Sequence, residues 1–420
     1  MIGKFLATAA ALSLTASGLL LVGTSAGAST GTVAAATPTT YALSASGYAS
    51  RVHGGGVPAD SGATAFQIIG CTDQAGLSKT NTQASITLQG IGTLSAAKTH
   101  VWTTNDNGVV SSWSRNSISK VVFVDSGLGV LSLDGIVSLS QASHDASGFH
   151  ARTKPTLGTI TLTVAGIDTH FPVPPPGQSV TIPGVATITV GAGTRTQSAH
   201  GASALLDAVT VELIPTNTTV YLGHSRANIH DGIKSGVFGG SAYGTQLTVV
   251  GGVGQVGQTP RIVMPCQGTN GKVRVRTITG VSLPGVGSVS GLSASELANQ
   301  TQTNAHAWER GKVAKATLAA GSLVITGVRG EARATYTVGS SVIKDTNGTT
   351  LAKVVFNGQV LQFPARGPLV IPGVASLTPK IVHRTPNGIE VTALQVKLLN
   401  GSGATINLGH AKVKVTPSGL

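Results

Sequence analysis

Short segments in which apolar and polar residues alternate with a period of two recur in both halves of this chain. Such alternation gives a strand one apolar and one polar face, which is typical of antiparallel sheets with one buried and one hydrated side. Turn signals fall between the segments, at Asp106-Asn107-Gly108, Asn347-Gly348 and Asn357-Gly358. The pattern predicts strands at residues 84–88, 131–133, 159–164, 209–213, 273–276, 323–326, 353–356, 394–398 and 413–415.

Residues 290–311 are the one stretch for which we consider a helix. Ser293-Ala294-Ser295-Glu296 fits a capping box, in which the serine and the glutamate satisfy backbone amides at a helix start. A four-residue pattern of this kind has little specificity.

The chain contains a long internal repeat. Ile-Pro-Gly-Val-Ala occurs at residues 182–186 and again at 371–375, and Leu-Gly-His occurs at 222–224 and 408–410. Proline and glycine in the first motif indicate a turn between strands. A repeat of this length indicates a duplicated domain, and we place the two copies at residues 41–231 and 235–420. Four residues recur 195 positions later: Cys71, Trp113, Arg115 and Lys120 match Cys266, Trp308, Arg310 and Lys315.

The first residues indicate export. Lys4, a mostly apolar run at 5–23 and the small residues Ala26-Gly27-Ala28 predict a signal peptide at residues 1–28. A retained membrane anchor is the alternative, because the run is close to the ~20 residues that a spanning helix needs. Residues 29–40 read as a flexible leader. With no hydrophobic tail or sorting motif at its end, we expect the mature chain to be secreted or on the cell surface, without a covalent anchor.

Composition favours strands with glycine-rich turns. Charged residues make up 10% of the chain, against ~25% in typical proteins. Hydrophobic residues reach 41%, which argues against disorder, and aromatic residues only 4%, so the cores must rest on Val, Ile, Leu and Ala. The predicted fold is all-β, with two tandem homologous β-sandwich-like domains after a signal peptide.

Charge is concentrated in the second copy. Residues 41–231 hold 9 Lys/Arg and 10 Asp/Glu, whereas residues 235–420 hold 17 and 5, a net charge of +12. This excess indicates an anionic partner. Lys272, Arg274 and Arg276 would share one strand face, and we take them as candidate polymer-binding residues. A hydrated outer sheet face, or charge that protects a sheet edge, is the competing interpretation.

Trp113 and Arg115, like Trp308 and Arg310, form a shared Trp-x-Arg motif. Residues i and i+2 of a strand lie on one face, so the guanidinium could cover the indole. We keep these four residues as candidates for an aromatic sugar platform, although a structural role is favoured.

The two cysteines occupy matched repeat positions. An exported chain permits a disulfide between them. Equivalent positions meet only if a pseudo-two-fold axis passes close to both, so we favour two buried free thiols.

Catalytic signatures are not recognisable. The chain contains no Gly-x-Ser-x-Gly, His-Glu-x-x-His or phosphate-binding loop. His224 and His410 recur without a second ligand beside them, so we expect neither a metal nor a cofactor. Acids do not recur either: Asp134 corresponds to Thr326, and Glu212 to Lys397. We therefore expect no enzyme, and a hydrolase with a site in the first domain is kept as an alternative.

The chain resembles the choice-of-anchor P family of bacterial secreted proteins. The resemblance rests on the strands before a glycine at residues 161–166 and 354–358, and on the Pro-Gly-Val segments that begin at Pro183 and Pro372. It implies a β-rich surface protein. We expect a non-enzymatic structural or adhesive protein of the cell envelope or extracellular space. The alternative is a binding module for carbohydrate or an anionic envelope polymer; nucleic acid is not an expected partner.

Overall fold

The computed structural model describes residues 36–420, except for 55–62, 89, 125–127, 249–255, 284, 352, 400 and 402. The predicted signal peptide lies outside these residues. The first strand, β1 (Thr37–His53), begins inside the predicted leader, so residues 37–40 belong to the sheet. Within the described ranges, no helix has the length and apolar character that a bilayer crossing requires.

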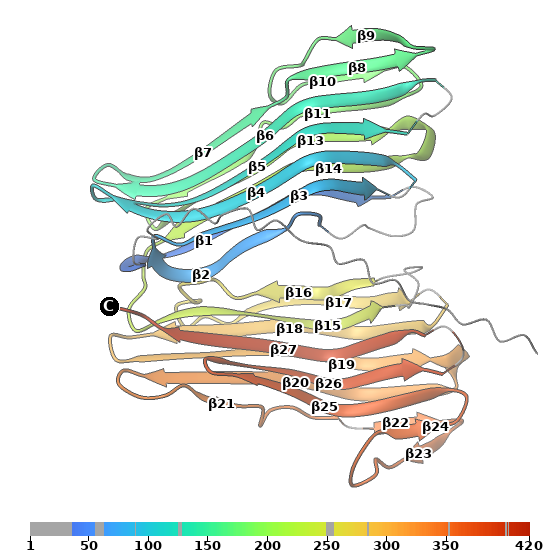
Figure 1. Cartoon of the computed structure of the whole chain (residues 1–420). Helices are drawn as coiled ribbons and strands as arrows, with labels where there is room; N and C mark the ends of the chain where they lie inside the picture. Colours follow the sequence, from blue (N-terminus) through green and yellow to red (C-terminus); the bar gives the residue numbers. More distant parts are fainter. Residues whose placement is uncertain are drawn as a thin grey trace, which may run out of the picture. The chain divides into compact units, whose positions relative to one another are not determined.

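The fold is all-β and contains four antiparallel sheets, which we call A to D (Figure 1). Sheets A and B enclose the core of repeat 1. Sheet A consists of β10 (Ser179–Ile182), β11 (Ala186–Val190), β13 (Gly201–Leu213), β14 (Thr218–His230), β1 and β2 (Gln67–Ala75), with β12 (Thr194–Ser198) also on β13. Sheet B consists of β3 (Ser78–Leu88), β4 (Gly92–Asp106), β5 (Val109–Phe123), β6 (Val130–Asp145), β8 (Thr159–Val164) and β9 (Ile167–Phe171), with β7 (Gly148–Thr156) also on β6.

Sheets C and D enclose the core of repeat 2 in the same way. Sheet C consists of β16 (Val256–Val263), β15 (Gly236–Thr248), β27 (Thr405–Pro417), β26 (Gly388–Leu398), β25 (Ala375–Thr385) and β24 (Leu369–Ile371). Sheet D consists of β17 (Arg274–Leu283), β18 (Gly287–Gln300), β19 (Asn304–Leu318), β20 (Leu323–Thr337), β22 (Lys353–Phe356) and β23 (Gln359–Leu361), with β21 (Ile343–Asp345) also on β20. Short 3-10 turns lie at Ile214–Thr216 and Ala319–Gly321.

The two repeats have the same strand order. Sheet A, read from its β2 edge, runs β2-β1-β14-β13-β11-β10, and sheet C runs β16-β15-β27-β26-β25-β24. Sheets B and D correspond in the same way, from β3 to β9 and from β17 to β23. The two sandwiches therefore have the same fold, built from homologous sequences.

Each sandwich is pinched at a waist of small residues. In repeat 2, a Cβ atom added to Gly311 would lie 2.1 Å from the carbonyl oxygen of Tyr243, and one on Gly330 would lie 1.9 Å from that of Gly409. In repeat 1, Ser140 Oγ donates across the waist to the carbonyl oxygen of Ser225, at 3.0 Å. The waist separates a larger from a smaller hydrophobic cluster in each repeat. This close approach of backbones leaves room only for small side chains at the waist.

The helix considered for residues 290–311 does not form, so this prediction is wrong. These residues form most of β18 and the first half of β19, and alternate residues of β18 from Leu292 face the core. The alternating burial of β18 matches a strand, and the four-residue match to a capping box does not indicate a helix here.

The duplicated Ile-Pro-Gly-Val-Ala segment is a turn in both repeats, as predicted. It closes the hairpins β10–β11 and β24–β25, with Val185 N–H donating to Ile182 O and Val374 N–H to Ile371 O, both at 3.0 Å. Gly184 and Gly373 have positive φ angles of 73° and 69°, which explains the glycine.

Candidate anion-binding groove

The two repeats are joined by a disulfide between Cys71 and Cys266, with Cα atoms 5.2 Å apart. The preference for free thiols is therefore wrong. Both cysteines lie at the same edge of their repeats, on β2 and just after β16, and the repeats adjoin along these edges, where β2 contacts β15. Ala42, Ile233 and Val237 pack around the bridge.

A groove of about 980 Å³ runs beside this disulfide and is lined by both repeats. Its charged lining is entirely cationic, because no Asp or Glu is among the lining residues. The cations come from four strands, β14, β16, β17 and β27. They are Arg226, Arg261, Arg274, Arg276, Lys412 and Lys414.

Strand geometry explains how these side chains meet. Arg274 and Arg276 are two residues apart on β17, as are Lys412 and Lys414 on β27, so each pair shares one face of its strand. Among these lining cations, Arg226 is the one that comes from repeat 1. It occupies the position in β14 that Lys412 occupies in β27.

Two of the six cations are neutralised by acids and four are not. Arg274 Nη1 lies 2.7 Å from Glu296 Oε1, and Lys412 Nζ lies 3.1 Å from Glu390 Oε2. Across the described residues, the remaining four have no carboxylate within ion-pair distance. These are Arg226, Arg261, Arg276 and Lys414.

Acids in repeat 2 offset little of this charge. Glu296 and Glu309 are directly paired on β18 and β19, and both side chains are 0% exposed. Burial raises the pKa of Glu309 well above its usual value, and the neighbouring Glu296 carboxyl raises it further. The pair therefore holds a proton at a pH where free carboxyl groups are charged, which makes repeat 2 more positive than its formal charge.

The sequence-predicted cations are only partly brought into the groove. Arg274 and Arg276 line it, as predicted for a shared strand face. Lys272 does not, because β17 begins at Arg274 and Lys272 lies in the preceding turn, where its N–H donates to Thr269 O.

The Trp-x-Arg motifs lie outside the groove. In repeat 1, Trp113 stacks on Trp102 with ring centroids 5.4 Å apart, and Trp102 stacks in turn on His100. Another tryptophan thus covers the Trp113 ring face, while Arg115 is exposed. A sugar platform at Trp113 is not favoured by this packing.

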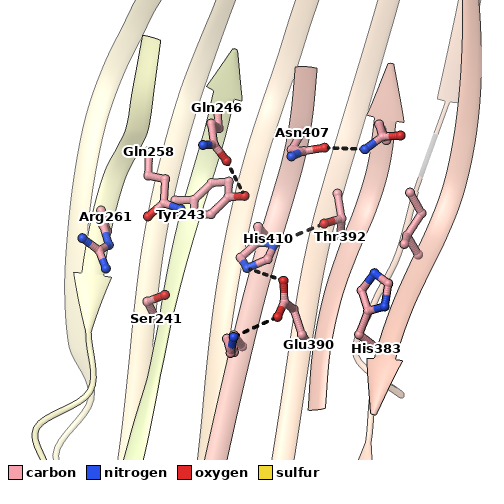
Figure 2. A pocket seen from close by; sticks show the side chains of 13 residues that line it. Ser241, Tyr243, Gln246, Gln258, Arg261, His383, Glu390, Thr392, Asn407 and His410 are labelled. Atoms are coloured by element: carbon pink, nitrogen blue, oxygen red, sulfur yellow. Dashed lines mark hydrogen bonds and ion pairs between the residues drawn. The ribbon is translucent and has the colours of Figure 1, made fainter. Parts of the chain in front are cut away.

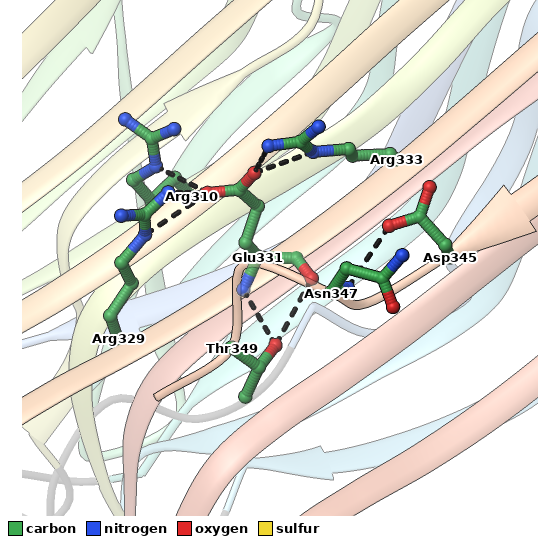
Figure 3. Close-up of polar contacts among 7 residues, drawn as sticks. All are labelled: Arg310, Arg329, Glu331, Arg333, Asp345, Asn347 and Thr349. Atoms are coloured by element: carbon green, nitrogen blue, oxygen red, sulfur yellow. Dashed lines mark hydrogen bonds and ion pairs between the residues drawn. The ribbon is translucent and has the colours of Figure 1, made fainter. Parts of the chain in front are cut away.

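In repeat 2, Arg310 lies over Trp308, 4.5 Å from the ring centroid. Arg310 also donates to Glu331, which Arg329 and Arg333 contact as well (Figure 3). Burial alone would raise the pKa of Glu331, but the hydrogen bonds from the three guanidinium groups lower it to about 2. Trp308 and Arg310 therefore belong to a network on sheet D.

Arg226 and Arg261 were not among the residues predicted from the sequence. A signal for Arg226 was present, because a cation follows each Leu-Gly-His two residues later, at Arg226 and at Lys412. Arg261 had no such signal, since its equivalent in repeat 1 is Phe66.

The recurring histidines mark a second equivalent position. His224 stacks on Tyr48 and His410 on Tyr243, with ring centroids 4.3 Å apart in both repeats. His224 Nδ1 lies 2.8 Å from Asp207 Oδ1, as in the orienting half of a catalytic triad. Among the described residues, no hydroxyl or thiol hydrogen bonds to the other ring nitrogen of His224. Repeat 2 has Thr392 in place of Asp207.

A scan against protein-family models and a search of curated proteins find no match to this chain. The resemblance to the choice-of-anchor P family stays a prediction.

Proposed function

We propose that this chain is an exported, non-enzymatic adhesive protein of the bacterial cell envelope or extracellular space, which binds an anionic polymer in the groove between its repeats. The observation that carries the proposal is the groove lining, which holds six cations and no acid. Four of these cations lack an acidic partner among the described residues, so their charge is available to a ligand.

The shape and spread of the charge favour a polymer over a small anion. The cations are distributed over four strands and both repeats along an open groove. A polymer with repeated negative charges can meet several of them at once, whereas one small anion cannot. Exposed charges attract such a polymer over roughly a Debye length, ~10 Å at 0.1 M salt.

Retention of the intact chain on an anionic matrix tests this proposal. The groove variant Arg261→Ser/Arg276→Ser/Lys414→Ser removes three uncompensated cations. The control variant Lys315→Ser/Lys353→Ser/Lys397→Ser removes three exposed cations outside the groove. Both variants should fold, because exposed charges contribute little to stability.

We expect the groove variant to elute at much lower salt than the wild type, with roughly a tenfold or greater loss of affinity near 0.1 M salt, where screening is still moderate. The control should elute close to the wild type. Equal losses in both variants would show that only net charge matters, and binding unaffected by salt would contradict the electrostatic proposal.

A further inference from the structure

A second groove, of about 400 Å³, lies on the outer face of sheet C (Figure 2). Its floor is the stacked pair Tyr243 and His410, whose rings are parallel to within 9°. Because the two rings face each other and are almost fully buried, neither offers a free face to a ligand. Four amide side chains line the groove above them: Gln246, Gln258, Gln395 and Asn407.

These amides are suited to hydroxyl groups. Gln246 Oε1 accepts from the Tyr243 hydroxyl at 2.8 Å, and Gln395 Nε2 donates to Asn407 Oδ1 at 3.0 Å. Each glutamine uses one of its two amide atoms in this way, so the amide nitrogen of Gln246 and the oxygen of Gln395 remain as donor and acceptor. A sugar hydroxyl both donates and accepts, and it fits such a mixed set.

The two grooves adjoin and share part of their lining. Ser241, Arg261 and Lys412 line both of them. Their charge differs, because Glu390 lines the second groove and pairs with Lys412 at 3.1 Å. A ligand that runs from one groove into the other passes from a surface with six cations and no acid onto a hydrogen-bonding surface with two cations and one acid.

The amide set is confined to the repeat that carries the positive charge. In repeat 1, Tyr221 occupies the place of Asn407 and Thr210 that of Gln395, although the Tyr–His stack is retained. The stack is thus a structural feature of both repeats, whereas the amides accompany the cationic groove.

From this juxtaposition we propose that the polymer is an acidic polysaccharide in which charged and uncharged sugars alternate. Its charged sugars lie in the cationic groove, and an uncharged sugar lies in the groove of sheet C, where the amides bind its hydroxyl groups. The inference rests on the proposed function, since it identifies the polymer that the same surface binds. A polymer charged at every unit would place an anion beside Glu390.

Binding of three polymers to the intact chain tests this assignment: hyaluronan, which alternates uronate and neutral sugars; polyphosphate, which is charged at every unit; and a neutral glucan. The variant Gln258→Leu/Gln395→Leu removes two amides without changing charge. The matched control, Gln83→Leu/Gln359→Leu, removes two exposed amides outside both grooves.

We expect the wild type to bind hyaluronan more tightly than polyphosphate at equal salt, and to bind the neutral glucan weakest. Gln258→Leu/Gln395→Leu should weaken hyaluronan binding about tenfold, the equivalent of one or two lost hydrogen bonds, and leave polyphosphate binding unchanged. The control should resemble the wild type.

The outcomes separate the two proposals. If the wild type binds neither acidic polymer, the proposed function is wrong and this inference falls with it. If the wild type binds both acidic polymers equally well and the amide variant changes neither affinity, the assignment of the polysaccharide is overturned. The proposed binding in the cationic groove is then retained. Equal losses for both polymers in the amide variant would also overturn it, because they would indicate damage to the shared wall of the grooves.

Discussion

Three glutamates of repeat 2 show how neighbours decide the protonation of one residue type. Glu309 and Glu331 are both 0% exposed, yet their pKa values move in opposite directions. Glu309 faces the core beside Glu296, and the burial of its charge outweighs the attraction of Arg274. Glu331 is surrounded by three guanidinium groups, which stabilise the carboxylate. Repeat 1 has Val101 and Ser114 where repeat 2 has Glu296 and Glu309, so the fold itself does not require the pair.

Glu309→Gln should stabilise the protein at neutral and higher pH. The pKa of Glu309 is raised in the folded state above its ordinary value of 4.5. The folded chain therefore keeps a proton that the unfolded chain loses, and the wild-type free energy of unfolding falls as the pH rises above 4.5. Glutamine cannot ionise. We expect the variant to be more stable by at least ~1 kcal/mol near pH 8 and no more stable near pH 4, since one pKa unit corresponds to ~1.4 kcal/mol.

Thermal unfolding at several pH values checks this, and Glu331→Gln is its matched control. The folded-state pKa of Glu331 is lowered to about 2, so its stabilisation is present above 4.5 and is lost as the pH falls through about 2. Glu331→Gln should therefore be less stable than the wild type at neutral pH, with a difference that shrinks in acid. Parallel pH profiles for wild type and Glu309→Gln would contradict the buried-pair interpretation.

At the scale of elements, the waist of each sandwich sets how close its two sheets lie. Gly311 and Gly330 of sheet D touch backbone atoms of sheet C, and the register gives Asn116 and Ser138 as their equivalents in repeat 1. Asn116 donates to Thr99 Oγ1 at 2.6 Å. Glycine in one repeat and small polar residues in the other thus fill the same narrow space.

Gly330→Ala should destabilise repeat 2 by about 2 kcal/mol or more, in the range of overpacked cores. The new Cβ would lie 1.9 Å from the carbonyl oxygen of Gly409, a contact that only a shift of the two sheets relieves. Gly257→Ala, on β16, is the control, because a Cβ there meets nothing within 4 Å. Chemical denaturation of both variants measures the difference, and equal midpoints would refute the close contact.

Several strands and turns were predictable from sequence because they follow local rules. Predicted segments such as residues 159–164 and 353–356 coincide with β8 and β22. The cationic groove was predictable only in part. Arg274 and Arg276 share a strand, which alternation reveals, whereas Arg226 and Arg261 join them through tertiary packing that no local pattern encodes. The stacking partner of Trp113 likewise comes from the neighbouring strand, β4.

At the scale of the whole molecule, the two repeats share a fold and differ in charge. Both repeats keep the strand order, the hairpin turns and the Tyr–His stack. Repeat 2 alone carries the excess of positive charge and the amide groove. The cationic groove nevertheless needs both repeats, because Arg226 comes from repeat 1. Binding is therefore not expected to belong to residues 235–420 alone.

The disulfide is the covalent element that holds the two halves of the groove together. Cys71 and Cys266 join edges that are 195 residues apart in the chain, and Gly419 N–H adds a hydrogen bond to Asp73 Oδ2 at 2.9 Å. A bridge that closes so long a loop contributes typically 2–4 kcal/mol to stability. Holding the cations in place in advance would also lower the entropic cost of the proposed binding.

Cys71→Ser/Cys266→Ser should therefore keep a β-type circular dichroism spectrum, because each repeat has its own hydrophobic clusters. The variant should unfold at a lower temperature than the wild type. It should also bind the anionic matrix less tightly at the same salt. In the wild type, thiol labelling of the unfolded protein should occur only after reduction. The double variant controls for unspecific effects of reductant. Added reductant should lower the matrix binding of the wild type and leave that of the variant unchanged. Two labelled cysteines in the unreduced wild type would refute the bridge. Equal binding by bridged and unbridged protein would show that the cations of repeat 2 suffice and that the placement of Arg226 contributes nothing.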